Sequence, residues 1–574
     1  MLRTWIAFLA ALLVALVAVS AAPAPTASTT LKVMSFNIFY GGDELNLRTR
    51  QFCKDAAGCP ETLDQVAAAI RASGADVVGL EEATMNTCPL AAKLGWNCSA
   101  RTQIISRYPI VDPPGADGLY VFVEPMPGRV VAVSDVHLPA DPYGPYEIRD
   151  GATLADVLQL ENELRVPDIQ DELATLPPLA ARGIPVFLTG DFNTPSHLDW
   201  TQAAADVRAD VPFPVQWPVS KALTDAGFTD SFRVVHPDPV AKPGFTWTPG
   251  SPEGEKVEVH DRIDWVLSIG AAPTASSVVG EGGSPNTDIA VDPWPSDHRG
   301  IVSTFTVSPA QMPALVAVEE RSLEQGQTLH VRFHGGASVA LVRGSFTAAS
   351  KSTGGAADGT LSFATANLAP GAYQAVLRNG SGQAISGSPF WLYWPGAVTT
   401  VTTPKSVYKV DEPIKVSWAK APGMKFDWLG LYSAGENADN PTASTCTAGL
   451  CGNGHYFLYT YTHNTIEGST TFDSSSPAGW KTWDQIGTGT YQIRLLLDDG
   501  YRSAAVSPPF KIVHPLPLAC LSSSWRTQSV TSRATSVTRN TLPRSASITV
   551  SACGRPTAGE RSPKPRVVSA TKLK

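Results

Sequence analysis

Polar side chains that could bind a metal ion and transfer protons follow apolar segments in the first half of this 574-residue chain. Carboxylates, amides and histidines without cysteine form the ligand set of a hard divalent ion combined with acid–base groups. Hydrolysis of a phosphoester needs charge neutralisation, an aligned water molecule and donors for the transition state, so this set favours phosphoester chemistry. The residues are Asn37, Glu81, Glu82, Asp135, His137, Asp191, Asn193, Asp264, Asp297 and His298.

Short apolar and β-branched runs must position these side chains. Several runs are continuously apolar, as buried strands are. Two intervening segments, 61–73 and about 153–176, have helical character. Strands with interspersed helices predict a large layered α/β (α+β) sandwich over residues 31–308. The expected strands are 31–39, 75–82, 102–110, 118–125, 129–138, 185–193, 262–269 and 300–307.

Six short motifs occur in order along this segment. They are SFN (35–37), GLEE (79–82), SDVHL (134–138), GDFN (190–193), DRIDWV (261–266) and SDHRG (296–300). With them, residues 31–308 resemble the endonuclease/exonuclease/phosphatase superfamily, whose prototype is the pancreatic-type deoxyribonuclease. The resemblance implies a four-layer sandwich with two mixed β-sheets packed face to face between helices. It also implies a metal-dependent phosphodiesterase or phosphatase.

The resemblance further implies a metal site. Asn37 and Glu82 would bind Mg²⁺, or alternatively Mn²⁺ or Ca²⁺, and Asp297 would support the metal ion or the hydrogen-bond network around it. Glu81 stands where the family usually has Gln. This departure either adds a negative charge beside the metal ion or has no effect, because Glu81 would point to the other face of its strand.

The remaining motif residues would carry the chemistry. His137 would hydrogen-bond the scissile phosphate, and Asp191 would orient or deprotonate the attacking water molecule. Asn193 would stabilise the transition state. His298 would act as general base, as general acid or as a stabiliser of the phosphorane, with its imidazole oriented by Asp264.

Five neighbouring residues have less certain roles. Asp135 occupies a position where many family members have Asn. Arg262 and Arg299 could be ion-pair partners at the edge of the site. Trp247 and His260 precede the DRIDW motif and either line the pocket or pack in the core, with packing favoured for Trp247.

Charge is distributed unevenly along the chain and bears on the substrate. The total of -8 combines -18 in residues 31–308, zero in 309–514, +9 in 515–574 and +1 from Arg3. An acidic unit is a poor host for a long polyanion. The sequence therefore leaves three substrate classes open, which are a phospholipid head group, an inositol phosphate and a nucleic acid. The alternatives are a secreted nuclease acting on DNA or RNA, and a non-enzymatic surface-binding protein with a vestigial catalytic domain.

The second half of the chain contains a diverged repeat. Alternating strands and the related segments GAYQ (371–374) and GTYQ (489–492) predict two immunoglobulin-like β-sandwiches, 314–396 and 397–514. The second contains DWLG (427–430), which resembles a signature of β-sandwich modules attached to some inositol-polyphosphate phosphatases. Core packing by its aromatic residues is the favoured interpretation. Residues 515–574 predict a disordered basic tail, or alternatively a surface-binding segment.

The first residues predict export. A basic residue followed by an apolar run indicates a signal peptide over 1–22, with an uncleaved anchor as the alternative. The eight cysteines suggest local disulfides, most simply 53/59, 88/98, 446/451 and 520/553. Asn97 and Asn379 lie in glycosylation sequons. We therefore expect a secreted or cell-surface-associated glycoprotein, monomeric and without stable membrane insertion.

Overall fold

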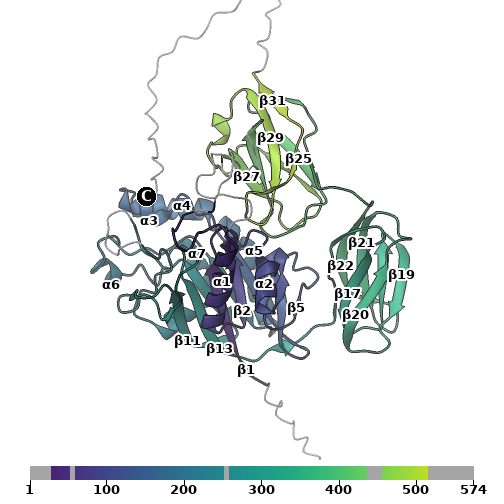
Figure 1. Cartoon of the computed structure of the whole chain (residues 1–574), viewed down its shortest axis with the longest axis horizontal. Helices are drawn as coiled ribbons and strands as arrows, with labels where there is room; N and C mark the ends of the chain where they lie inside the picture. Colours follow the sequence, from purple (N-terminus) through teal and green to yellow (C-terminus); the bar gives the residue numbers. More distant parts are fainter. Residues whose placement is uncertain (1–26, 52, 54–58, 251–257, 436–454, 515–574) are drawn as a thin grey trace, which may run out of the picture. The chain divides into compact units, whose positions relative to one another are not determined.

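The computed structural model describes residues 27–51, 53, 59–250, 258–435 and 455–514, and the described part up to Val513 forms one compact unit. Its cartoon is shown in Figure 1. The expected signal peptide, the 446/451 and 520/553 cysteine pairs and the basic tail lie outside the described residues. No helix in the described part is long and apolar enough to cross a membrane.

The first sheet of the N-terminal α/β domain has seven strands, with a parallel pair near its middle. The parallel strands are β1 and β2, and β1 runs antiparallel to β13 on its other side. The strand order is β12 (Ile289–Ala290), β11 (Ala271–Gly280), β13 (Gly300–Val307), β1 (Thr29–Asn37), β2 (Val77–Glu81), β4 (Ile104–Ser106) and β3 (Asn97–Ser99).

The second sheet also has a central parallel pair, formed by β7 and β8. Its other pairings are antiparallel, so both sheets are mixed. The order is β5 (Ile110–Val111), β6 (Tyr120–Met126), β7 (Arg129–His137), β8 (Val186–Asp191), β10 (Asp264–Ile269) and β9 (Thr229–Asp230), with β14 (Ala310–Gln311) beside β7.

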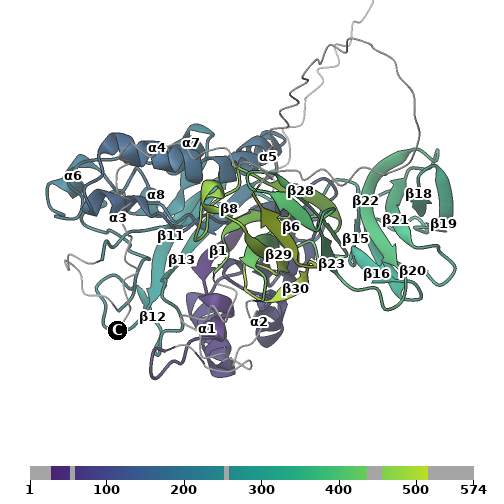
Figure 2. The same ribbon diagram turned by 90° about the horizontal axis from the view of Figure 1, so that it is seen from above.

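Alternating side chains build the layers. In β1, Leu31 and Val33 belong to the core between the two sheets, whereas Met34 and Phe36 pack against α1 (Pro60–Ser73) on the outer face. This alternation is the period of two expected for a strand buried on both faces. In Figure 2 the labelled strands β8, β11, β13 and β1 lie between α4, α5 and α7 on one side and α1 and α2 on the other.

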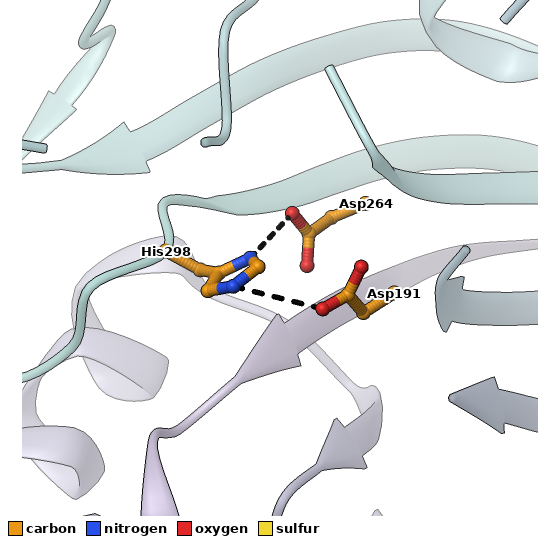
Figure 3. Close-up of side chains that lie close together, drawn as sticks. All are labelled: Asp191, Asp264 and His298. Atoms are coloured by element: carbon orange, nitrogen blue, oxygen red, sulfur yellow. Dashed lines mark hydrogen bonds and ion pairs between the residues drawn. The ribbon is translucent and has the colours of Figure 1, made fainter. Parts of the chain in front are cut away.

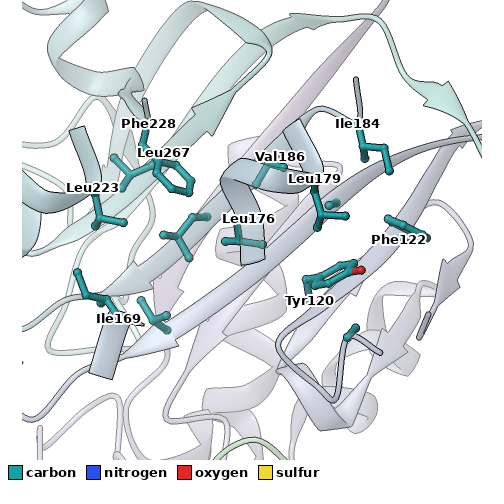
Figure 4. Close-up of a cluster of buried hydrophobic side chains, with 14 of the residues drawn as sticks. Tyr120, Phe122, Ile169, Leu176, Leu179, Ile184, Val186, Leu223, Phe228 and Leu267 are labelled. Atoms are coloured by element: carbon teal, nitrogen blue, oxygen red, sulfur yellow. The ribbon is translucent and has the colours of Figure 1, made fainter. Parts of the chain in front are cut away.

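A second outer core covers the other sheet. Leu176 and Leu179 of α5 (Gln170–Ala181) and Leu223 of α7 (Pro218–Asp225) pack on Val186 and neighbouring residues, as Figure 4 shows. Burial of such side chains contributes about 1.5–3 kcal/mol each. The other helices are α2 (Thr87–Leu94), α3 (Gly144–Arg149), α4 (Leu154–Leu164), α6 (Gln202–Ala205) and α8 (Ser231–Val235).

Two expected elements differ in the structure. The run 102–110 is not one strand, because its parts enter different sheets as β4 and β5. The helical segment 153–176 is two helices, α4 and α5, separated by a 3₁₀ turn that begins at Pro167. Proline removes a helical hydrogen bond, which explains the interruption. The expected disulfides Cys53–Cys59 and Cys88–Cys98 are both present.

The first β domain has two sheets around one core that contains Val331, Leu341 and Phe390. The three-stranded sheet contains β15 (Leu315–Val318), β17 (Thr328–His334) and β20 (Asp358–Ala364). The five-stranded sheet contains β16 (Ser322–Glu324), β22 (Ala384–Tyr393), β21 (Gly371–Arg378), β18 (Ser338–Arg343) and β19 (Phe346–Ser352).

The second β domain has the same two-sheet plan around Val416, Leu431 and Ile493. The small sheet contains β23 (Thr400–Thr402), β25 (Ile414–Ala419) and β28 (Gly468–Phe472). The large one contains β24 (Val407–Lys409), β31 (Phe510–Val513), β29 (Gly489–Leu496), β26 (Trp428–Ser433) and β27 (Leu458–Tyr461), with β30 (Ser503–Val506) beside β29. An immunoglobulin-like relationship stays a prediction for both domains.

Candidate active site

Strand register brings the polar motif residues together. At the carboxyl ends of the parallel pairs, Asn37 lies opposite Glu81, and His137 lies opposite Asp191. On the other side of β8, Asp264 begins β10 directly opposite Asp191. The parallel pair of each sheet therefore ends in polar side chains at the same place in the fold.

His298 connects two of these carboxylates. Its Nδ1 lies 3.0 Å from Asp264 Oδ2, and its Nε2 lies 3.6 Å from Asp191 Oδ2, as Figure 3 shows. The side chains are almost fully buried, with exposed fractions of 5%, 0% and 1% for His298, Asp264 and Asp191. A carboxylate that bonds Nδ1 fixes the orientation of the imidazole and leaves Nε2 available to donate or accept a proton.

Asn37 and Glu82 lie on the other side of Asp191. The Asn37 Nδ2 group donates to Asp191 Oδ2 at 3.1 Å and to Glu82 Oε1 at 3.2 Å. Glu82 follows the end of β2 with a φ of 56°, and its Oε2 accepts from the Tyr40 backbone amide at 2.9 Å. The left-handed backbone conformation of Glu82 turns its carboxylate away from the strand and toward Asn37.

Asp297 provides a test of whether a cation fits this site. Its buried Oδ1 has no hydrogen-bond partner. Burial raises the pKa of Asp297 to about 7, with His298 lowering it and the charge of Glu82 raising it. A buried carboxylate oxygen without a donor, facing a second carboxylate, fits a divalent cation with oxygen ligands. Asn37 Oδ1 accepts from the Phe39 amide and keeps a second lone pair for such an ion.

A second group of possible metal ligands lies beside the group formed by Asn37, Glu82 and Asp297. Atoms of Asp191, Asp264 and His298 lie within 4.8 Å of one another. Because His298 Nδ1 and Asp264 Oδ2 already bond each other, we interpret this trio as an acid–base group rather than a ligand set. The two groupings meet at Asp191.

Charge within the trio favours a protonated histidine. Burial alone lowers the pKa of His298, but the charges of Asp264 and Asp191 and the bond to Asp264 raise it well above its usual value. Burial raises the pKa of Asp191 to about 6, while attraction to His298 lowers it. A cationic imidazole next to an ionised carboxylate can hold a phosphate oxygen or supply a proton.

His137 approaches the centre from β7. Its Nε2 lies 3.7 Å from Asp191 Oδ2, and its Nδ1 lies 2.5 Å from Asp499 Oδ2. Burial lowers the pKa of His137, but the charge of Asp499 and the bond to it raise the value to about 10. Both histidines therefore turn Nε2 toward the same carboxylate oxygen.

Asn193 lies just beyond β8 in a turn. Its backbone amide donates to Asp191 Oδ1 at 3.0 Å, and its side-chain Nδ2 donates to Leu138 O at 2.9 Å. Its φ of 48° is in the left-handed region, which Asn tolerates better than most residues. In this structure Asn193 stabilises the turn that holds Asp191.

Glu81 and Asp135 lie beneath the site, between the sheets, and both are fully buried. Glu81 Oε1 accepts from Ser35 Oγ at 2.8 Å. Burial, and then the facing Asp135 carboxylate, raise the pKa of Glu81 well above its usual value. The raised pKa disfavours a negative charge on Glu81, and the effect of this departure on the metal site stays a prediction.

The remaining sequence candidates have structural contacts. Arg262 is fully buried and pairs with Asp199 and Asp230, and Arg299 pairs with Glu281, so neither guanidinium contacts the motif residues. The Trp247 ring packs against the His298 imidazole with centroids 4.9 Å apart and therefore borders the site.

His260 packs in the core against Phe245. It is 4% exposed, and its Nδ1 accepts from the Thr248 amide at 3.3 Å. This contact places it in the packed structure behind the site.

Asp499 contacts His137 from outside the sequence motifs, and the sequence offered no reason to expect it there. It lies 362 positions after His137 and belongs to the second β domain. The only local signal is the pair of aspartates in the turn Leu497-Asp498-Asp499-Gly500, which by itself indicates a turn.

The described residues combine a mixed two-sheet fold with a buried Asp–His–Asp centre. Residues 34–298 match the model of the Endonuclease/Exonuclease/phosphatase family. Members of the family hydrolyse phosphoester bonds and generally depend on a divalent metal ion.

Similar proteins occur in other organisms. An uncharacterized protein of Caenorhabditis elegans is 28% identical over 308 residues, 49% of this chain and 92% of that protein. Among solved structures, an endonuclease/exonuclease/phosphatase from Beutenbergia cavernae is 18% identical, with a TM-score of 0.31, over 63% of this chain and all of that one. An AP endonuclease from Archaeoglobus fulgidus is 14% identical, with a TM-score of 0.29, over 48% of this chain and 99% of that one.

Proposed function

We propose that the chain is a secreted, divalent-metal-dependent hydrolase that cleaves a phosphoester by attack of water on phosphorus. The observation that carries the proposal is the pair of histidines, His137 and His298, whose Nε2 atoms lie 3.7 and 3.6 Å from the same Asp191 oxygen. Two donors and one carboxylate around a common point can hold a phosphate and direct a water molecule.

The metal ion would be held by Glu82, Asn37 and Asp297. Bound there, a Mg²⁺, Mn²⁺ or Ca²⁺ ion would neutralise charge on the phosphate oxygens and polarise the phosphorus centre. Asp191 would orient the water molecule and accept its proton. His137 would hold a phosphate oxygen through Nε2.

His298 would donate from Nε2 to the phosphorane or to the leaving oxygen, with Asp264 keeping the imidazole in place. Asn193 would serve by holding the Asp191 turn, in addition to the transition-state contact expected from the sequence. Each of these roles depends on one proton or one hydrogen bond of a named side chain, so a single substitution can remove each role separately.

The substrate that charge favours is a compact phosphoester, such as a phospholipid head group or an inositol phosphate. The net charge of -18 over residues 31–308 repels a long polyanion. Cleavage of DNA or RNA, and binding without catalysis, are the competing functions. Export is supported by the signal-peptide pattern of residues 1–22.

A substrate panel tests the proposal. Purified full-length protein would be incubated with bis-p-nitrophenyl phosphate, inositol polyphosphates, sphingomyelin and plasmid DNA, each with Mg²⁺, Mn²⁺, Ca²⁺ or EDTA. We expect metal-dependent release of product from a small phosphoester. No turnover of any substrate with any of the ions would support the non-enzymatic alternative.

Two variants connect the activity to this site. His298→Ala should abolish hydrolysis, and Glu82→Gln should reduce it strongly at a Mg²⁺ concentration that just saturates wild type. His330→Ala, at a half-buried histidine of the first β domain, should do neither. Circular dichroism would show that each variant is folded. Full activity in both site variants would refute the assignment of the site.

A further inference from the structure

A loop of the second β domain docks on the catalytic domain through a buried carboxylate. The loop lies between β29 and β30, and Asp498 in it is fully buried. Asp498 Oδ2 accepts from the Met85 backbone amide at 2.7 Å, and Oδ1 accepts from Gln103 Nε2 at 2.8 Å. Both oxygens therefore bond to groups of the catalytic domain.

A second segment of the same domain docks nearby. The Lys425 amide donates to Arg101 O at 2.8 Å, and Arg101 Nε donates to Gly423 O at 3.0 Å. The Lys425 ammonium pairs with Glu172 at 3.0 Å, and both side chains are at most 12% exposed. Buried, reciprocal bonds of this kind define one orientation of the docked surfaces.

The DWLG motif holds these two segments together. Asp427 Oδ2 accepts from the Gly423 and Met424 amides, and its Oδ1 accepts from the Asp498 amide at 3.1 Å. Trp428 Nε1 donates to Gly500 O at 3.0 Å. The motif therefore fixes the loop that contains Asp498 and Asp499, in addition to packing in the core.

Asp499 contacts the active site directly. Its Oδ2 lies 2.5 Å from His137 Nδ1, and its amide donates to Phe426 O at 2.9 Å, which anchors the residue on its own domain. Within the described residues, no other side chain hydrogen-bonds His137 Nδ1. A carboxylate on Nδ1 sets the tautomer and the direction in which Nε2 points.

We propose that Asp499 is a positioning residue for His137, so that the active site of the catalytic domain is complete only when the second β domain is docked. The inference builds on the proposed function, in which His137 Nε2 holds a phosphate oxygen. Asp499 itself contacts no reacting atom. Its effect on the reaction passes through the imidazole.

A double-mutant cycle on the full-length protein tests this coupling. The variants Asp499→Asn, His137→Ala and the double variant would be assayed on bis-p-nitrophenyl phosphate with Mg²⁺. We expect Asp499→Asn to reduce kcat about 10–100-fold, as loss of a supporting carboxylate does, and to have no further effect in His137→Ala. Asp411→Asn, an exposed aspartate of the same domain, is the control and should match wild type.

Two results would overturn the proposal. One is an unchanged kcat in Asp499→Asn. The other is an equal loss in the presence and absence of His137, because a general structural defect would lower activity in both backgrounds. Asp499→Glu, which keeps a carboxylate, should recover part of the activity that Asn loses.

A measurement without substrate separates this inference from the proposed function. In protein labelled with ¹⁵N-histidine, the signals absent from His137→Ala identify His137, and Asp499→Asn should shift only these. Protection of the Met85 amide from hydrogen exchange should persist, because Asp498 still docks the loop. Unshifted His137 signals, or loss of that protection, would refute the positioning role. Absence of turnover in wild type would instead refute the proposed function alone.

Discussion

Asp264 holds His298 by a buried hydrogen bond of 3.0 Å between Oδ2 and Nδ1. Asp264 begins β10, whereas His298 lies just before β13 in the other sheet. The pair therefore joins the two sheets at the point where Asp191 ends β8. Its geometry depends on the packing of the whole sandwich and not on one local turn.

Replacing this carboxylate by an amide should impair catalysis more than folding. Asp264→Asn keeps the size of the side chain but removes the charge that stabilises a protonated His298. We expect kcat to fall about 10²-fold or more, which is the usual contribution of a positioned acid–base group. Steady-state kinetics with the most reactive substrate of the panel would measure the change.

The control for this variant is Asp225→Asn, an exposed aspartate at the end of α7. It should retain the wild-type kcat. If Asp264→Asn also retained it, with its folding intact, His298 would not need its partner and the proposed role of the pair would be wrong.

Removal of a metal-binding carboxylate should change the metal requirement. We expect Glu82→Gln to raise the Mg²⁺ concentration for half-maximal activity by at least about tenfold, because a neutral amide attracts the cation less strongly. Titration of EDTA-treated protein with Mg²⁺ would measure the shift. Glu163→Gln, on the exposed face of α4, should titrate like wild type. Identical curves for all three proteins would exclude Glu82 as a ligand.

The polar residues at the strand ends could be predicted because each one lies next to its strand in the sequence. Asp191 follows the apolar run Val186–Leu188, and Asp264 precedes another, so the motifs indicate both the strand and the polar residue at its end. Parallel pairing then brings such ends together. The two mixed sheets were implied by the family resemblance that these motifs carry, and the structure confirms them.

The contribution of the second β domain could not be predicted. Asp499 and His137 are distant in sequence, and their contact depends on how two separately built domains dock. The raised pKa of Glu81 was also beyond sequence reasoning, since it results from burial and from the facing Asp135 carboxylate. Pairing and burial between elements are properties of the tertiary structure.

Arg262 should matter for stability. Its guanidinium is fully buried and donates to Asp230 Oδ2 at 2.7 Å and to Asp199 Oδ1 at 3.1 Å. Arg262→Ala would leave these carboxylates partly uncompensated, and loss of one partner of a buried ion pair typically costs about 3–5 kcal/mol. We expect the melting temperature of the catalytic domain to fall in differential scanning calorimetry.

The activity of this variant separates stability from catalysis. Because the Arg262 guanidinium pairs with Asp199 and Asp230 and with none of the proposed catalytic or metal-binding residues, kcat per folded molecule should stay close to wild type at a temperature well below the transition. Arg71→Ala, an exposed arginine of α1, is the control for loss of a surface charge. A large loss of kcat with unchanged melting would instead place Arg262 in the catalytic machinery.

Stability of the second β domain should depend on pH through Asp427. Burial raises the pKa of this carboxyl to about 7, although the Met424, Asp498 and Gly423 amides lower it. The folded state therefore holds the proton more tightly than the unfolded state, whose carboxyl has its usual pKa of about 4. Stability from this group is present below pH 4 and is lost as the pH rises toward 7.

Asp427→Asn removes this titration. The variant loses one of the two oxygens that accept from backbone amides, so its melting temperature should lie below that of wild type at pH 5. The difference between the two melting temperatures should become smaller as the pH rises to 8, because only wild type then buries a charge. Calorimetry at pH 5, 6, 7 and 8 would follow the transition of the second β domain. In Asp411→Asn, whose side chain is exposed, the melting temperature should depend on pH as it does in wild type. A constant gap between Asp427→Asn and wild type at all four pH values would show that Asp427 does not titrate in this range.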